Sequence, residues 1–203
     1  MTQFAALLVG ILIGSAPTAD LLGRWWGVDL RGSGTANPGA NNAFKLGGKG
    51  LGIAVLMVEM AKGVVAVSGG TLLGGDPGGA LAAIGSIAGN VYNPWFRFRG
   101  GKGLGITGGT LAGAWPPLVP VLVIVIAVSV AAMRRSGPAS LVTFAVYVAA
   151  AVVGLFVDLP TGWGLTSAGW LAVMAVGSVA VMLPKHGADA RPVKSAVRPG
   201  SPG

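Results

Sequence analysis

Residues 118–133 read LVPVLVIVIAVSVAAM, an apolar run that carries no charge and leads directly into the basic pair Arg134-Arg135. Runs of near-spanning length recur from Phe4 to the neighbourhood of Pro184, and a helix needs roughly 20 such residues to cross a bilayer. Of the 203 residues, 53% are hydrophobic and 10% are charged, and the mean hydropathy is +0.74. This composition excludes an ordinary soluble domain and predicts an all-α polytopic membrane protein.

The hydrophobic pattern predicts about seven transmembrane helices, at about 4–22, 50–73, 79–96, 103–116, 118–133, 138–157 and 164–183. The segment that ends at Pro116 is shorter than the roughly 20 residues of a full crossing, so some helices are expected to be short or broken inside the protein. We expect residues 1–184 to form the membrane domain. Residues 185–203, which are basic and rich in Pro and Ala, are expected to form a disordered cytoplasmic tail.

The basic residues predict how these helices are oriented. If the chain crosses the membrane seven times, all of its 14 Lys and Arg residues except Lys62 fall on the same side. By the positive-inside rule that side is the cytoplasm, which places the N-terminus outside and the C-terminus inside. In so apolar a chain, the net charge of +8 indicates anionic lipid headgroups and anionic substrates as partners, and no nucleic acid.

Several kinds of catalytic site are excluded by composition. The chain has no cysteine and a single histidine, His186, so it cannot build a thiol nucleophile, a zinc–thiolate site or a cluster of histidine ligands. The glycine-rich segment around Lys102 is not a P-loop, because Gly103 follows the lysine where Ser or Thr is required. We expect neither a metal nor a cofactor.

A duplicated heptapeptide marks two segments as candidates for the site. Gly-Gly-Lys-Gly-Leu-Gly-Ile occurs at residues 47–53 and again at residues 100–106. A lysine among glycines at the mouth of a helix offers backbone N–H groups, the positive end of a helix dipole and a charge. This combination suits a phosphate or a carboxylate.

The stretch before the first copy, residues 29–45, alternates glycines with hydroxyl, amide and basic side chains. Glycine and asparagine also dominate plain connectors for conformational reasons, but a connector does not need so many polar side chains in one stretch. We therefore favour an anion site in this stretch and the lysine of the first copy. The polar residues predicted to contribute to it are Arg31, Ser33, Asn37, Asn42, Lys45 and Lys49.

The stretch that contains the second copy, residues 89–103, combines aromatic side chains with three cations. We interpret the aromatic residues Tyr92, Trp95, Phe96 and Phe98 as anchors at the membrane interface. An anchor does not explain Lys102, which has glycines on both sides, so this lysine is predicted to bind a phosphate.

Inside the second apolar segment, Glu59 and Lys62 are three residues apart and share one face of a helix. Ionisable residues in a span are costly, and they usually occupy paired, functional places. A functional pair and a structural ion pair that locks helices together are both kept as hypotheses.

Together these stretches are similar to the bacterial acyl-phosphate:glycerol-3-phosphate acyltransferases, the PlsY family, over most of residues 10–110. Residues 14–17 resemble the family's G-S-I-P, residues 31–45 its R-x-x-G-S-G-N-x-G-A-T-N-x-x-R motif, and residues 59–63 a D-x-x-K-G element. The most specific match is residues 98–103, which resemble the F-K-G-G-K-G core of the second motif.

The chain also departs from the family pattern. Thr35-Ala36 is inserted in the first motif, and Lys45 replaces its final arginine, which keeps the charge but loses the bidentate fork. Asn90 stands where the second motif has histidine. The third motif is nearly absent, although His186 and Asp189 keep the spacing of its His and Asn.

The resemblance implies transfer of a fatty acyl group from acyl phosphate to the 1-hydroxyl of glycerol 3-phosphate, which gives lysophosphatidate, at the cytoplasmic face of the bacterial cell membrane. It implies catalytic roles for Ser33, Asn37, Lys45 and Lys102. The residues implied in phosphate binding are Arg31, Gly32, Gly34, Gly39, Asn42, Arg99, Gly100, Gly101 and Gly103, and the further candidates are Asn90 and His186.

Two other functions stay open. The degraded third motif favours a catalytically inactive homologue that binds phospholipid precursors. Glu59, Lys62 and the broken helices favour a small anion transporter, although the polar residues cluster toward one face of the membrane and a transporter needs them near its midplane.

Overall fold

The computed structural model describes residues 1–190, and every regular element within them is a helix. In chain order the elements are α1 (Thr2–Ser15), α2 (Thr18–Trp25), α3 (Ala40–Val91), the 3-10 helix η1 (Pro94–Phe96), α4 (Leu104–Ala114), α5 (Leu118–Met133), α6 (Ser136–Val153) and α7 (Ala168–Ala190). By length and composition, 4 helical stretches of this part of the chain can cross a membrane, and α5 is a shorter apolar helix. The predicted all-helical class is confirmed.

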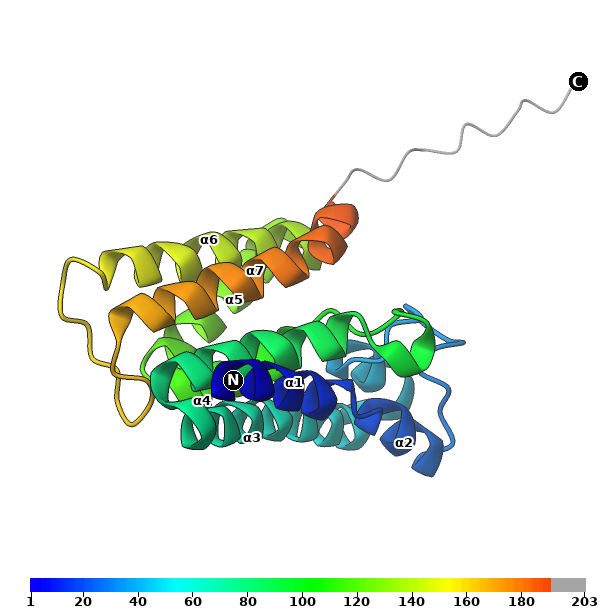
Figure 1. Ribbon diagram of the computed structural model, residues 1–203. Coiled ribbons are helices and arrows are strands. Elements are labelled where there is room, and N and C mark those ends of the chain that lie inside the picture. The colour runs from blue at the N-terminus through cyan, green and yellow to red at the C-terminus, as the bar shows by residue number, and fades with distance from the viewer. Residues whose placement is uncertain (191–203) are drawn as a thin grey trace, which may run out of the picture.

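Helix α3 folds back on itself. The backbone at Gly74 and Gly75 is non-helical, with φ of −151° and +62°, and Pro77 just beyond the bend has no N–H to continue a helical ladder. Gly70 and Gly78 face each other so closely that a Cβ on either would overlap the carbonyl oxygen of the other. The result is a hairpin of two limbs, residues 49–73 and 76–91 (Figure 1).

The helices approach one another closely where glycines face a neighbour. A Cβ on Gly10 or Gly14 of α1 would overlap the backbone of the second α3 limb, and a Cβ on Gly85 or Gly89 of that limb would overlap the backbone of α1. Both helices thus present glycines four residues apart to each other, the small-residue packing that membrane helices use.

Two layers of helices make up the bundle. Figure 1 shows α1, α3 and α4 in one layer and α5, α6 and α7 in the other. A buried apolar cluster joins the two layers, with Val67 and Leu111 from the first, Tyr147 and Met174 from the second, and Trp115 from the connection between α4 and α5. Because these side chains come from several helices, the cluster fixes the bundle as a unit.

The connections divide between the two ends of the bundle. One end holds the loop after α2, the loop between α3 and α4, the turn between α5 and α6, and the end of α7 (Figure 1). The opposite end holds the start of α1, the α3 bend, the α4–α5 connection and the loop 154–167. The two predicted glycine–lysine segments therefore lie toward the same end, which is called the basic end below.

Several predicted boundaries differ from the structure. The first segment is interrupted at Ala16-Pro17, where α1 gives way to α2. The sixth helix ends at Val153, before the predicted residue 157. Helix α7 continues past Pro184 to Ala190, so residues 185–190, which we assigned to a disordered tail, are helical because contacts with the α3–α4 loop hold them. The rest of that expected tail lies outside the described residues.

Candidate active site

Two loops meet at the basic end. The first loop, residues 26–39, connects α2 to α3, and the second loop, residues 92–103, connects α3 to α4. The Arg31 guanidinium of the first loop donates to the carbonyl oxygen of Arg99 in the second, and its Cζ lies 3.5 Å from the centre of the Phe96 ring. The segments that carry Ser33 and Lys102 are thus neighbours in space, although α3 separates them in sequence.

Arg31 is committed to this joint between the loops. Its Nε and Nη2 atoms lie 2.7 and 2.9 Å from the two carboxylate oxygens of Asp20 on α2, while Phe96 covers its planar face. This bidentate, stacked geometry is specific to arginine. Arg31 was predicted to bind substrate phosphate, but the structure uses its guanidinium to join α2 to both loops.

Asn42 shapes the first loop. Its side chain is fully buried, donates to the carbonyls of Leu30 and Ser33 at 2.9 and 3.1 Å, and accepts the N–H of Thr35 at 2.9 Å. Gly34 has φ of +63°, and a Cβ there would overlap the Asn42 amide oxygen, so glycine is required. Asn42, also predicted to bind phosphate, instead holds the loop that carries Ser33.

A local carboxylate occupies two of the amides that were expected to face a ligand. Asp29 accepts the N–H groups of Arg31 and Gly32 at 2.9 and 3.0 Å. The backbone hydrogen bonds from Gly32 and Arg31 hold the pKa of the exposed Asp29 carboxyl below its usual value. The Gly32 N–H is therefore not an open phosphate ligand in this arrangement.

Other predicted side chains of the first loop remain open. Ser33 and Lys45 are exposed, and Asn37 is half-buried. Within residues 1–190, the side chains of these three residues have no hydrogen bond or ion pair. Gly39 caps the start of α3 with extended backbone angles. The exposed hydroxyl and ammonium groups are the ones free to meet an anion.

The glycines of the second loop serve close packing rather than open binding. The N–H groups of Gly100 and Gly101 donate to the carbonyls of Val91 and Asn90 at 3.1 and 3.0 Å. A Cβ on Gly100 would overlap the Asn90 carbonyl oxygen. These two amides, which we predict to bind phosphate, are thus bonded within the protein, whereas Gly103, with φ of +84°, is the N-cap of α4.

The C-terminal end of α7 is hydrogen-bonded to the second loop. Lys185 Nζ donates to the carbonyls of Val91, Gly100 and Gly101 at 2.7, 2.7 and 3.0 Å. His186 Nε2 lies 3.0 Å from the carbonyl oxygen of Lys102. These contacts place the remnant of the third motif directly beside the second.

Asp189 completes the contact between α7 and the second loop by forming an ion pair with the Lys102 ammonium. Lys185 is not among the predicted site residues, because Pro184 is typical of the end of a helix. A signal was nevertheless present, since Lys185 immediately precedes the histidine of the degraded motif.

A buried polar cluster lies below the loops. Glu59 and Lys62 are each 7% exposed, and Lys62 Nζ lies 3.0 and 3.2 Å from the two Glu59 oxygens. Thr18 and Asn90 also donate to this carboxylate, at 2.8 and 2.6 Å. Glu59 and Asn90 line a small pocket whose other polar walls include Asp20 and Arg31. The pair is thus structural in its contacts and adjacent to the site in its position.

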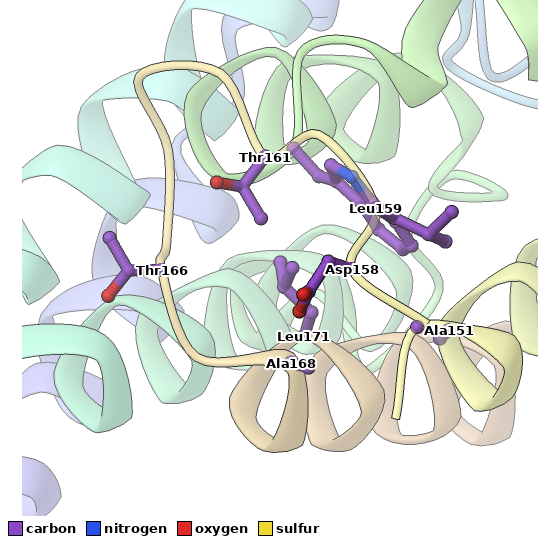
Figure 2. A pocket seen from close by; sticks show the side chains of 9 residues that line it. Ala151, Asp158, Leu159, Thr161, Thr166, Ala168 and Leu171 are labelled. Atoms are coloured by element: carbon purple, nitrogen blue, oxygen red, sulfur yellow. The ribbon is translucent and has the colours of Figure 1, made fainter. Parts of the chain in front are cut away.

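A second pocket lies at the opposite end, under the loop 154–167. Figure 2 shows Asp158, Thr161 and Thr166 around it, with Leu159 and Leu171 among its apolar walls. Its lining residues include an acidic side chain and no lysine or arginine. This pocket does not suit a phosphate, so the basic end is the candidate active site.

Comparison with known proteins finds relatives over much of this chain. The family model of glycerol-3-phosphate acyltransferase matches residues 4–193. The chain is 42% identical over 118 residues to a glycerol-3-phosphate acyltransferase of Synechococcus sp. (strain JA-2-3B'a(2-13)), a match that covers 57% of this chain and 59% of the relative. It is 37% identical over 142 residues to one of Rhodopseudomonas palustris (strain HaA2), covering 69% and 72% of the two chains.

The fold is similar to the crystal structure of PlsY (YgiH), an integral membrane glycerol 3-phosphate acyltransferase. Its glycerol 3-phosphate form superposes with a TM-score of 0.74 at 21% identity, over 93% of this chain and 90% of that one. Its lysophosphatidic acid form gives 0.71 at 19% identity, over 92% and 88%. The polytopic membrane fold predicted from hydropathy thus agrees with a solved membrane protein, and by its sequence match this chain belongs to the glycerol-3-phosphate acyltransferase family.

Proposed function

We propose that this protein transfers a fatty acyl group from acyl phosphate to the 1-hydroxyl of glycerol 3-phosphate, giving lysophosphatidate and phosphate for phospholipid synthesis. The observation that carries the proposal is the meeting of the two glycine-rich loops at the basic end, through Arg31, Phe96 and Arg99. Both substrates carry phosphate groups, and this meeting point gathers cations from three separate parts of the chain. Membership of the acyltransferase family supports the reaction type.

The chemistry asks for anion binding more than for a strong base. The hydroxyl oxygen attacks the acyl carbonyl carbon, a new C–O bond forms, and the bond between the acyl carbon and the phosphate oxygen breaks. Phosphate is a good leaving group, so stabilising its charge and that of the carbonyl oxyanion supplies much of the catalysis. The hydroxyl proton passes to the departing phosphate. His186 is poorly placed as a base, because its Nε2 is 3.0 Å from the Lys102 carbonyl.

We assign the following roles to the residues. Lys102 and Lys45 bind the substrate phosphates by charge-assisted hydrogen bonds, and Ser33 and Asn37 orient the acceptor hydroxyl or the acyl carbonyl. Lys102 exchanges its ion pair with Asp189 for a phosphate when substrate binds. The apolar helix surfaces hold the acyl chain in or beside the bilayer.

We also propose that the chain crosses the bacterial cell membrane seven times, with the N-terminus outside and the active site and C-terminus in the cytoplasm. The positive-inside rule supports this orientation, since the lysines and arginines of residues 1–190, except Lys62, lie in or next to the loops of the basic end. The opposite end carries Asp76 and Asp158 in its connections.

The two alternative functions have less support. The family matches do not favour an inactive binding protein. Against an anion transporter, the intramembrane charges Glu59 and Lys62 are bonded to each other and to Thr18 and Asn90, rather than standing free along a path.

A direct assay tests the reaction. Purified protein in lipid nanodiscs is supplied with acyl phosphates of several chain lengths and labelled glycerol 3-phosphate, and labelled lysophosphatidate is separated and counted. We expect product that depends on both substrates and is strongly reduced in Lys102→Ala. A folded wild-type sample that gives no product with any chain length would contradict the proposal.

A further inference from the structure

The buried pair Glu59–Lys62 is connected to the loop that carries Lys102. We propose that Glu59, held in place by Lys62, is a positioning residue that acts through Asn90 to set the place of the Gly101–Lys102 backbone. Its effect on turnover rests on the proposed acyl transfer, whereas its effect on the loop does not.

The first support is how completely the Glu59 carboxylate is bonded. Its Oε1 accepts from Thr18 at 2.8 Å and from Lys62 at 3.0 Å, and its Oε2 accepts from Asn90 at 2.6 Å and from Lys62 at 3.2 Å. A buried carboxylate is tolerated only when it is paired and hydrogen-bonded in this way. The donors come from α2 and from both limbs of α3, so one side chain ties three helical segments together.

The second support is that Asn90 contacts both Glu59, through its side chain, and the second loop, through its backbone. Its side chain donates to Glu59, and its backbone carbonyl accepts the N–H of Gly101 at 3.0 Å. A Cβ on Gly100 would overlap that same carbonyl, so the loop lies directly against Asn90. A shift of Asn90 must therefore move the backbone next to Lys102, and misplacement of a catalytic group by about 1 Å can cost roughly 100-fold in rate.

Lys62 holds the opposite wall of the small pocket that Glu59 and Asn90 line. Its ammonium donates to the carbonyl of Ala16 at 2.9 Å and lies 3.4 Å from Thr18 Oγ1. Ala16 lies at the interruption between α1 and α2, and its carbonyl accepts both the Lys62 ammonium and the N–H of Thr18, the latter at 2.9 Å. Ala16, Thr18, Asn90 and Gly101 all line one pocket, so the Glu59–Lys62 pair holds two of its walls at a set separation.

The geometry makes a reciprocal test available. The 2.6 Å contact between Asn90 Nδ2 and Glu59 Oε2 leaves no slack. Glu59→Asp shortens the acceptor side chain by one methylene, which withdraws the carboxylate by about 1.5 Å. Asn90→His replaces the amide by an imidazole ring, whose N–H can reach farther from the backbone. Each change alone breaks or crowds the contact, and the double variant pairs a shorter acceptor with a longer donor.

The experiment combines hydrogen exchange with kinetics on the full-length protein in nanodiscs. We expect Glu59→Asp and Asn90→His each to speed amide exchange in peptides covering residues 97–103 and to lower kcat by roughly 10- to 100-fold, with a smaller change in KM. The double variant should recover most of both. Thr71→Val is the control, because within residues 1–190 the Thr71 hydroxyl donates only to the carbonyl of Val67 in the same helix, near the opposite end of the bundle; it should leave loop exchange and kcat unchanged.

Two results would overturn the positioning role. One is wild-type exchange of residues 97–103 in both single variants, and the other is a double variant no better than the worse single one. The exchange measurement decides the proposal even if wild-type protein shows no turnover, an outcome that would instead count against the acyltransferase assignment.

Discussion

The ammonium group of Lys185 lies 2.7 Å from the carbonyl oxygen of Gly100, across 85 residues of sequence. It also donates to the carbonyl of Val91, the last residue of α3, which has no partner within its own helix. The C-terminal end of α7 thereby holds the loop that presents Lys102.

Replacement of Lys185 by methionine should loosen that loop. Hydrogen bonds from a charged donor contribute about 1.5–3 kcal/mol, so we expect kcat/KM to fall by roughly tenfold or more. The measurement is steady-state acyl transfer by folded protein in nanodiscs. Lys49→Met is the matched control, since the Lys49 side chain is exposed and has no hydrogen bond or ion pair within residues 1–190; equal losses in the two variants would contradict the assignment.

The two lysines of the duplicated heptapeptide should differ in importance. Lys102 lies in the loop held by α7, beside Asp189, whereas Lys49 follows the break at Gly48 and is exposed. Loss of a charge-assisted phosphate contact costs about 1.5–3 kcal/mol, or roughly 10- to 200-fold. Lys102→Ala should lose at least that factor in kcat/KM and Lys49→Ala should change little, and similar effects would mean that the duplication itself is functional.

Lysine should not replace Arg31. An ammonium cannot reproduce the two contacts with Asp20, the contact with the Arg99 carbonyl and the stacking on Phe96 at the same time. We expect Arg31→Lys to lower activity and to increase protease cleavage within residues 26–39. Arg24→Lys, a change at an exposed position of α2, should do neither. Wild-type activity and cleavage in Arg31→Lys would show that charge alone is needed there.

Lys45 tests the altered end of the first motif. Because its side chain is exposed and unpaired among the described residues, Lys45→Arg can offer a bidentate fork to a phosphate without breaking a contact. Acyl transfer should be retained or raised in this variant, and Lys45→Ala should raise the KM for glycerol 3-phosphate. If Lys45→Ala leaves that KM unchanged, Lys45 does not bind this substrate.

The proposed orientation can be tested by labelling single cysteines, since the natural chain has none. Thr35, Trp95 and Trp163 are exposed, and cysteines at the first two should react with an impermeant maleimide only from the cytoplasmic side. A cysteine at Trp163, in the loop 154–167, should react only from outside. Opposite sidedness for positions 35 and 95 would separate the two halves of the active site and refute its location.

Much of the fold follows from local sequence. The bilayer selects apolar helical segments one at a time, and Gly74, Gly75 and Pro77 mark the bend of α3 without any long-range information. The glycine–lysine repeat and the motif around Ser33 likewise pointed to the basic end. These features are visible because each depends on residues that are close together in the chain.

Tertiary structure decided which polar groups are open and which are committed. Arg31, Asn42 and Gly100 are predicted phosphate ligands, and in the folded chain they are bonded to Asp20, Leu30 and Val91. Lys185 was assigned to the tail, yet its ammonium holds the loop that carries Lys102. The sequence determines which residues carry hydrogen-bond donors. Their acceptors depend on which distant segments the packed helices bring within about 3 Å, and this is decided only when the bundle is assembled.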